Sequence, residues 1–314
     1  MKLKLKKNVK IFFVVVLIGI FIVSYGINKY KEYVYHQTTE YKLTLSGYTV
    51  KEARFIESKL QAKNVEKFLN KKKNDFLLKL LNEKYFMGKN LDRYLTYHEK
   101  NNDKTISDVI AIVNVNADKE WYENMTDTDM SKGVEILVNK FHTIKEYAPD
   151  DLESININYS YDGQTIRKEV HEAYVDMASQ AKEQGIKLIV SSSYRSYAEQ
   201  EQVYKEFYYS KGQTYADAYA ARAGSSEHQS GLALDIFSPD GTTTSTFENT
   251  EAYKWLINNS YKYGFILRYP KDKTYLTGYE YESWHFRYLG KELATKVYNE
   301  NITYDEYYAY YLDK

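Results

Sequence analysis

The pattern of hydrophobic and polar positions differs from one stretch of the chain to the next. An apolar run extends from Ile11 to Val23 and continues weakly to Ile27. About 17 residues is the lower limit for a helix that spans a membrane. Polar, lysine-rich sequence follows to about residue 130, after which regular apolar segments begin. In chain order, the pattern predicts a basic tail (1–10), a membrane anchor (11–27), a stalk or small accessory domain (28–130) and a main folded domain (131–314).

The residues around the apolar run indicate on which side of the membrane each part of the chain lies. Five lysines precede it, namely Lys2, Lys4, Lys6, Lys7 and Lys10. Basic residues before a span favour a cytoplasmic N-terminus and an exported C-terminal part. A cleaved signal peptide opens in the same way, but Ser24-Tyr25-Gly26 is a poor cleavage site. We therefore expect an uncleaved anchor in the cytoplasmic membrane with the main domain outside, and a cleaved, secreted form is the alternative.

Two helices and one strand are predicted between the anchor and residue 130. Thr49 and Glu52 have the spacing of a capping box, and apolar residues recur behind them with helical periodicity. A second, leucine-rich helix is expected to start at Asp75. The β-branched segment from Thr105 to Val115 is typical of a strand. His36 and His98 are isolated, so the stretch contains no predicted catalytic cluster.

The main domain combines helical and strand patterns. A helix is predicted from Ile166 to about Gln184, ending at Gly185. Lys187 to Ser192 then has the composition of a strand. A second strand is expected over 232–237, where apolar residues alternate around one aspartate. The polar ends of such strands are common places for a functional site.

Composition excludes several classes of function. Apolar residues make up 43% of the chain, which is enough to bury a core. Lys+Arg and Asp+Glu both number 43, and this balance gives no indication of nucleic-acid binding. Cysteine is absent, which excludes disulfides, thiolate metal sites and cysteine nucleophiles. A bound metal would therefore need histidine or carboxylate ligands.

Two clusters supply such ligands. The first runs from Ser226 to Asp235 and includes His228, and the second runs from Glu282 to Arg287 and includes His285. Catalytic zinc uses three protein ligands, drawn from histidine nitrogen and carboxylate oxygen, and keeps a position for water. We predict that His228, Asp235 and His285 bind one zinc ion per chain. Gly231 would let the backbone turn so that two ligands seven positions apart converge.

Glu282 is the natural general base beside this metal. A carboxylate within hydrogen-bond reach can take a proton from a zinc-bound water and deliver it to the leaving amine. Residues 282 and 285 would face opposite sides of a regular strand, so we expect Glu282 on a turn that leads into the strand of His285. His142 and His171 lie in probable helices or at their ends, and we expect neither to bind metal.

Three segments together resemble the VanY-type D-alanyl-D-alanine carboxypeptidases, zinc peptidases related to lysostaphin-type enzymes and hedgehog signalling domains. They are Ser193-Tyr194-Arg195-Ser196-Tyr197, the stretch from Ser226 to Asp235, and Glu282-Ser283-Trp284-His285. The resemblance covers roughly residues 131–314, and the closing segment from Thr303 to Tyr307 is also similar. One departure is Ala223, where the family often has proline.

The resemblance implies an α+β fold with a central antiparallel sheet flanked by helices and the zinc in a groove on the sheet. It implies the same three ligands, with Glu282 as the base. It also implies that Arg195, together with Gln200, Arg222 and Ser226, binds the substrate and stabilises the transition state. The resemblance does not reach the region before residue 131.

The expected activity is removal of the terminal D-alanine from peptidoglycan stem peptides. A wall endopeptidase or an L,D-carboxypeptidase on the same scaffold is the alternative, because the sequence does not show whether the groove is open at both ends. A non-catalytic binding module is a third class, which the presence of Glu282 and all three ligands disfavours. The expected partners are stem peptides and the cytoplasmic membrane, and no nucleic acid.

Overall fold

The computed structural model describes residues 7–239 and 243–313, so Lys2, Lys4 and Lys6 of the predicted basic tail lie outside the described residues. The chain divides into two compact units, Met1–Leu95 and Thr96–Lys314. The second unit thus begins well before residue 131, where the sequence pattern places the start of the main domain. We call the second unit the catalytic unit, because it contains all the predicted site residues.

The first unit opens with one long apolar helix, α1 (Lys7–Gln37). Its mean hydropathy reaches 2.5, and its apolar side chains are exposed along its length. At 1.5 Å per residue, 31 residues extend over about 46 Å, which is longer than the hydrocarbon core of a bilayer. The helix is therefore long and apolar enough to cross a membrane, and it continues beyond the predicted range 11–27.

Short helices make up the rest of the first unit: α2 (Thr39–Leu45), α3 (Val50–Lys59), α4 (Ala62–Val65), η1 (Glu66–Phe68), α5 (Asp75–Leu81), η2 (Gly88–Asn90) and the start of α6 (Leu91–Lys100). The predicted capping box is confirmed, because Thr49 and Glu52 exchange side-chain and backbone hydrogen bonds at the start of α3. The helix predicted from Asp75 is also confirmed, and Asn74 caps it.

The strand predicted over Thr105–Val115 is wrong, since the segment forms helix α7 (Ile106–Asn114). The Thr105 side chain accepts a hydrogen bond from the backbone N–H of Asp108 and caps the helix. The helix is buried from Val109 onward, so its apolar residues do not alternate with polar ones. The β-branched composition had suggested a strand, because a short buried apolar run does not by itself distinguish a helix from a strand.

Residues 96–130 belong to the catalytic unit and pack against its later part. Ala111 and Ile112 of α7 form a small apolar cluster with Leu276 and Ala309. Further along the chain, the rings of Trp121, Tyr122 and Tyr279 lie 5.3, 5.5 and 4.5 Å from the Nζ atom of Lys140. Lys140 is buried, its ammonium donates to the backbone carbonyls of Asp217 and Gly278, and burial lowers its pKa to about 8.

A four-stranded antiparallel sheet forms the centre of the catalytic unit, in the order β5 (Ile189–Ser192), β6 (Ala233–Phe237), β8 (Glu282–Tyr288) and β7 (Phe265–Tyr269). Two-stranded pairs join β1 (Thr126–Asp127) to β2 (His142–Thr143) and β3 (Leu152–Ser154) to β4 (Thr165–Arg167). The predicted α+β fold with a central antiparallel sheet is confirmed.

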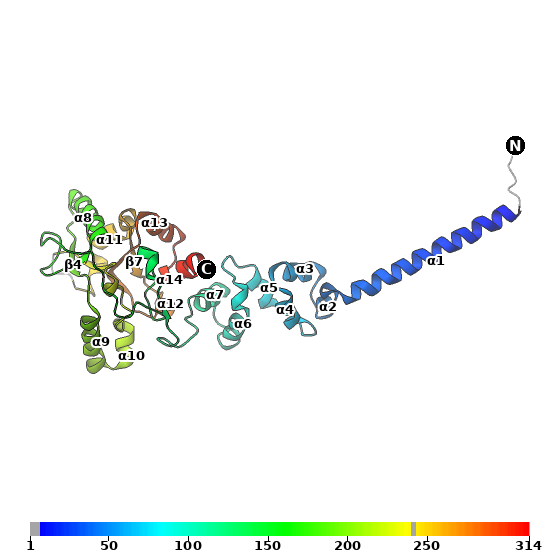
Figure 1. Cartoon of the computed structure of the whole chain (residues 1–314), viewed down its shortest axis with the longest axis horizontal. Coiled ribbons are helices and arrows are strands. Elements are labelled where there is room, and N and C mark those ends of the chain that lie inside the picture. Colours follow the sequence, from blue (N-terminus) through cyan, green and yellow to red (C-terminus); the bar gives the residue numbers. More distant parts are fainter. Residues whose placement is uncertain (1–6, 240–242, 314) are drawn as a thin grey trace. The chain divides into compact units, whose positions relative to one another are not determined.

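Helices surround this sheet (Figure 1). They are η3 (Met130–Glu135), α8 (Lys168–Glu183), α9 (Tyr197–Lys211), α10 (Gln213–Tyr219), η4 (Glu227–Ser230), η5 (Phe247–Asn249), α11 (Glu251–Asn259), η6 (Ser260–Tyr263), α12 (Thr274–Thr277), α13 (Lys291–Glu300), α14 (Tyr304–Tyr307) and the π-helical η7 (Tyr308–Leu312). Helix α8 starts two residues after the predicted Ile166, because that residue pairs in β4.

Two apolar clusters hold the helices against the sheet. The larger one joins Tyr174 and Met177 of α8 to Leu234 and Phe286 of the central strands, and it includes Phe265 of β7. The adjacent residue of β7, Ile266, belongs instead to the cluster of α13 and α14. Because successive side chains of a strand point to opposite faces, the sheet is covered on both faces at β7.

Candidate metal centre and active site

Two neighbouring strands and the turn before them carry the predicted metal ligands. Asp235 of β6 lies directly opposite His285 of β8 in the antiparallel register, so both side chains are on one face of the sheet. His228 lies in η4, the short helix that precedes β6. Gly231 ends η4 with φ 69°, a left-handed conformation that glycine adopts readily. A Cβ atom there would lie 2.7 Å from Cγ of Arg167, so the position also has no room for a side chain.

The three ligand atoms converge. The Nε2 atom of His228 and the Nδ1 atom of His285 lie 3.4 and 3.5 Å from Oδ1 of Asp235, and one ligand atom from each residue falls within 4.8 Å of the others. Oδ1 of Asp235 is buried and has no hydrogen-bond partner among the described residues. A buried carboxylate oxygen seldom lacks a hydrogen-bond partner in proteins. The donor set of two imidazoles and one carboxylate fits zinc.

Neighbouring groups set the tautomer of His228 and the ionisation of Asp235. The Nδ1–H of His228 donates to the carbonyl oxygen of Ser193 over 2.7 Å, which leaves the lone pair on Nε2 directed at Asp235. Burial alone would raise the pKa of Asp235, but the neighbouring histidines lower it to about 2. Asp235 is therefore ionised at neutral pH, as a metal ligand must be.

Glu282 also reaches the site, although not from the predicted turn. It is the first residue of β8, and its Oε2 atom lies 3.3 Å from Nδ1 of His285. Glu282 pairs with Tyr269 and Phe286 pairs with Leu267, so β8 carries two more residues than β7 over this stretch. This irregularity breaks the alternation of side chains and turns residues 282 and 285 toward the same space. Burial raises the pKa of Glu282, and the contact with His285 offsets part of this rise.

Arg195 lies beside the ligands in the same pocket, which has a volume of about 210 Å³. Its guanidinium donates to Oε1 of Gln200 over 2.6 Å and to Oγ of Ser192 over 2.9 Å. Gln200 in turn donates to the carbonyl oxygen of Ala221. Both hydrogen-bond partners of the guanidinium are neutral, so its positive charge stays available to an anion. Gln200 and Ser226 also line this pocket.

Arg222 is placed differently from the other predicted substrate-binding residues. Its guanidinium makes a paired contact with Asp217, at 3.0 and 2.9 Å, and lies 4.1 Å from the centre of the Tyr122 ring. It is not among the residues that line the pocket. A direct contact of Arg222 with substrate stays a prediction. In the structure, Arg222 lies in the loop before η4 and packs against Tyr122.

The two histidines that we expected not to bind metal lie outside the pocket. His171 is in α8, as predicted, and faces Glu153 at 3.1 Å. His142 contacts the Asn139 side chain, but it lies in strand β2 and not in a helix as predicted.

Several lining residues escaped the sequence analysis. They are Val203, Phe207, Tyr219, Tyr269, Tyr279 and Trp284, together with Glu227 next to the first ligand. The aromatic residues come from α9, α10, β7, the segment before β8 and, for Trp284, β8 itself, and only the fold brings them together. Trp284 and Glu227 lie within the two sequence segments that carry the predicted ligands. Their position next to a ligand in the sequence could have indicated that they line the pocket.

Comparisons with known proteins agree with this geometry. Residues 163–291 match the family described as "VanY: D-alanyl-D-alanine carboxypeptidase". The chain is 38% identical over 199 residues to "D-alanyl-D-alanine carboxypeptidase" of Enterococcus faecalis (strain ATCC 700802 / V583), and the match covers 59% of this chain and 71% of that protein. The chain belongs to the VanY family. Members of this family are zinc carboxypeptidases, and the residues that converge here fit that metal.

Two further relatives of the VanY family are informative. "Putative carboxypeptidase YodJ" of Bacillus subtilis (strain 168) is 40% identical over 183 residues, which cover 55% of this chain and 66% of YodJ. The match thus leaves about a third of YodJ uncovered. A solved structure of the LdcB LD-carboxypeptidase, described in terms of peptidoglycan recognition, is 36% identical with a TM-score of 0.56, and the match covers 60% of this chain and 91% of LdcB.

The ligand assignment can be tested by zinc content. Asp235→Ala should remove most of the zinc from the purified full-length protein, because it deletes one of three ligands. Glu282→Gln is the matched control, since it changes a neighbouring carboxylate that is not a ligand, and it should keep the metal. Elemental analysis measures both. Full zinc occupancy in Asp235→Ala would contradict the assignment.

Proposed function

We propose that this enzyme removes the terminal D-alanine from peptidoglycan stem peptides by zinc-dependent hydrolysis. One observation carries the proposal: a single pocket holds the three-ligand set, the carboxylate of Glu282 and the guanidinium of Arg195. The first two are what hydrolysis of a peptide bond requires. The third is an anchor for a negatively charged group of the substrate. Membership of the VanY family supports the same substrate class.

Glu282 is proposed as the proton carrier of the reaction. When zinc is bound, it polarises the scissile carbonyl and lowers the pKa of a bound water toward 7. Glu282 would take the proton from this water and pass it to the leaving amine. Its buried setting, which raises its pKa, brings the proton affinity of the carboxylate closer to that of the groups it serves.

Arg195 is proposed to bind a substrate oxygen anion. A guanidinium can make paired hydrogen bonds either to the terminal carboxylate or to the oxyanion that develops at the scissile carbonyl. Gln200 and Ser192 fix its orientation without neutralising it. Ser226, also in the pocket wall, would complete the binding of the D-alanine residue.

An L,D-carboxypeptidase is the second candidate, and the structural likeness to LdcB favours it. Such an enzyme would act on a stem already shortened by one D-alanine. The two candidates differ in substrate alone, so incubating the protein with pentapeptide and tetrapeptide stems and weighing the products by mass spectrometry separates them. Release of D-alanine from the tetrapeptide in preference to the pentapeptide would establish the second.

The role of Glu282 gives a test of chemistry apart from metal binding. Glu282→Gln should lower the rate of stem-peptide hydrolysis by about 2–4 orders of magnitude, as expected when a general acid–base group is lost. The variant must be shown to hold zinc and to be folded. A rate near that of the wild type would show that Glu282 is not the base.

The charge of the substrate terminus gives a test of exopeptidase action. Amidating the terminal carboxylate should lower kcat/KM. If the change removes a charged hydrogen bond, the corresponding activation free energy should rise by at least about 1.5–3 kcal/mol. Arg195→Lys should cost activity on the free acid, because an ammonium does not reproduce the paired contact. If the amidated stem is cut equally well, or intact cross-bridges are cleaved faster than free stems, the endopeptidase alternative replaces this proposal.

We also propose that α1 is an uncleaved anchor and that the catalytic unit lies outside the cytoplasm. The apolar length of α1 and the lysines before its apolar run support this orientation. Protease added to intact protoplasts should then digest the catalytic unit, as measured by immunoblotting. Protection of the unit would contradict the topology, and a soluble, shortened protein in the medium would indicate cleavage.

A further inference from the structure

Glu227 stands next to the active site but has no part in the mechanism described above. It lies in η4 between Ser226 and the ligand His228, and its side chain has no exposed surface. A carboxylate is almost never fully buried unless it is paired, so its partners indicate why it is there.

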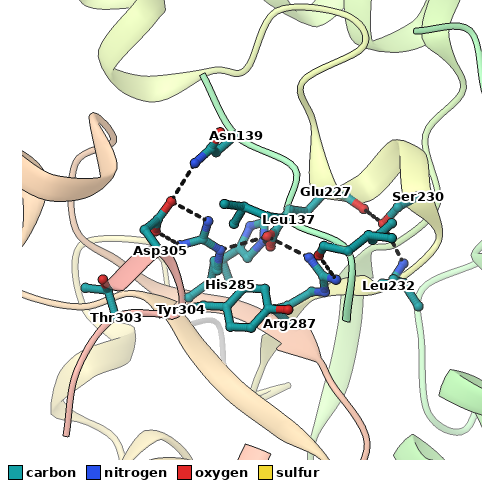
Figure 2. A network of polar contacts seen from close by, with 12 residues as sticks. Leu137, Asn139, Glu227, Ser230, Leu232, His285, Arg287, Thr303, Tyr304 and Asp305 are labelled. Atoms are coloured by element: carbon teal, nitrogen blue, oxygen red, sulfur yellow. Dashed lines mark hydrogen bonds and ion pairs between the residues drawn. The ribbon is translucent and has the colours of Figure 1, made fainter. Parts of the chain in front are cut away.

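One oxygen of Glu227 is held by two arginines (Figure 2). Its Oε1 atom accepts from Nε of Arg268 over 2.7 Å and from Nη1 of Arg287 over 2.8 Å. Arg268 continues to Asp305 of α14, which also accepts a hydrogen bond from Asn139. Two guanidiniums and two carboxylates therefore form a buried group with no net charge. The group fixes the position of Glu227 from two strands and the C-terminal helix.

The other oxygen faces a metal ligand. Oε2 of Glu227 lies 3.4 Å from Nε2 of His285, and both atoms are buried with no hydrogen-bond partner in the described part of the chain. The second ring nitrogen of His285, Nδ1, points instead to Asp235 and Glu282. The ring is thus placed between a fixed carboxylate on one side and the metal position on the other.

We propose that Glu227 is a positioning residue that holds His285 with its proton on Nε2, so that the lone pair of Nδ1 is free for zinc. Ligating histidines commonly donate their other N–H to a carboxylate, which fixes the tautomer and the orientation of the ring. The hydrogen bonds from Arg268 and Arg287 to Oε1 keep Glu227 in place. The inference rests on the assignment of His285 as a ligand in the proposed function.

Glu227→Gln tests this role. Glutamine has the size of glutamate and its oxygen can still accept from the arginines, but it then presents an amide N–H₂ to Nε2 of His285. That group favours the opposite tautomer, with the proton on Nδ1. Zinc affinity of the full-length protein in detergent, measured by competition with a fluorescent chelator, should fall about 10–100-fold.

Asp305→Asn is the matched control. It removes one carboxylate charge from the same buried group but does not contact His285. If the group only stabilises the fold, both variants should lower the melting temperature and leave zinc affinity unchanged. We expect the affinity to fall in Glu227→Gln alone. Unchanged affinity in Glu227→Gln, or an equal loss in Asp305→Asn, would overturn the inference.

A spectroscopic measurement on the wild-type protein covers the case in which Glu227→Gln does not fold. With ¹⁵N-labelled histidine, the zinc-loaded protein should show the His285 proton on Nε2, identified by its absence in His285→Ala. A proton on Nδ1 would overturn the inference. Loss of zinc in His285→Ala with normal affinity in Glu227→Gln would leave the metal site intact and remove only the role of Glu227.

Discussion

The pairing of β6 with β8 is the constraint on which the active site depends. Asp235 and His285 are fifty positions apart in the chain, yet the register places them directly opposite one another. A shift of one residue would turn one of them to the other face of the sheet. Buried neighbours such as Leu234 and Phe286, which pair in the same register, fix it through the core. Packing that has nothing to do with chemistry thereby sets the distance between two predicted metal ligands.

The three predicted ligands could be picked out in the sequence because their pattern departs from what packing alone would produce. Asp235 interrupts an apolar strand, and Gly231 stands at the point where a left-handed residue was needed. The capping box at Thr49 and the helix end at Gly185 were equally visible, since each depends on contacts within a few residues. The antiparallel sheet came from the family resemblance and not from periodicity.

Features that depend on tertiary contacts were not predictable in this way. Helix α7 is a short apolar run that the fold buries from Val109 to Asn114, and such a run does not distinguish a helix from a strand. Glu282 reaches the pocket through an irregularity between β7 and β8 that involves Leu267 and Tyr269, far away in the sequence. Arg222 was assigned by the family resemblance, whereas its contacts with Asp217 and Tyr122 require two other segments of the chain.

The aromatic enclosure of Lys140 has a consequence for how the enzyme can be shortened. Trp121 and Tyr122 lie before the region of family resemblance, yet they shield this ammonium together with Tyr279, which is part of the pocket wall. A fragment that begins at residue 131 would expose a cation whose surroundings were built for a dry interior, and it would uncover Leu276 and Ala309 at the same time. An enzyme shortened from its N-terminus therefore keeps this enclosure only if it begins before Trp121, and the compact unit that contains both residues begins at Thr96.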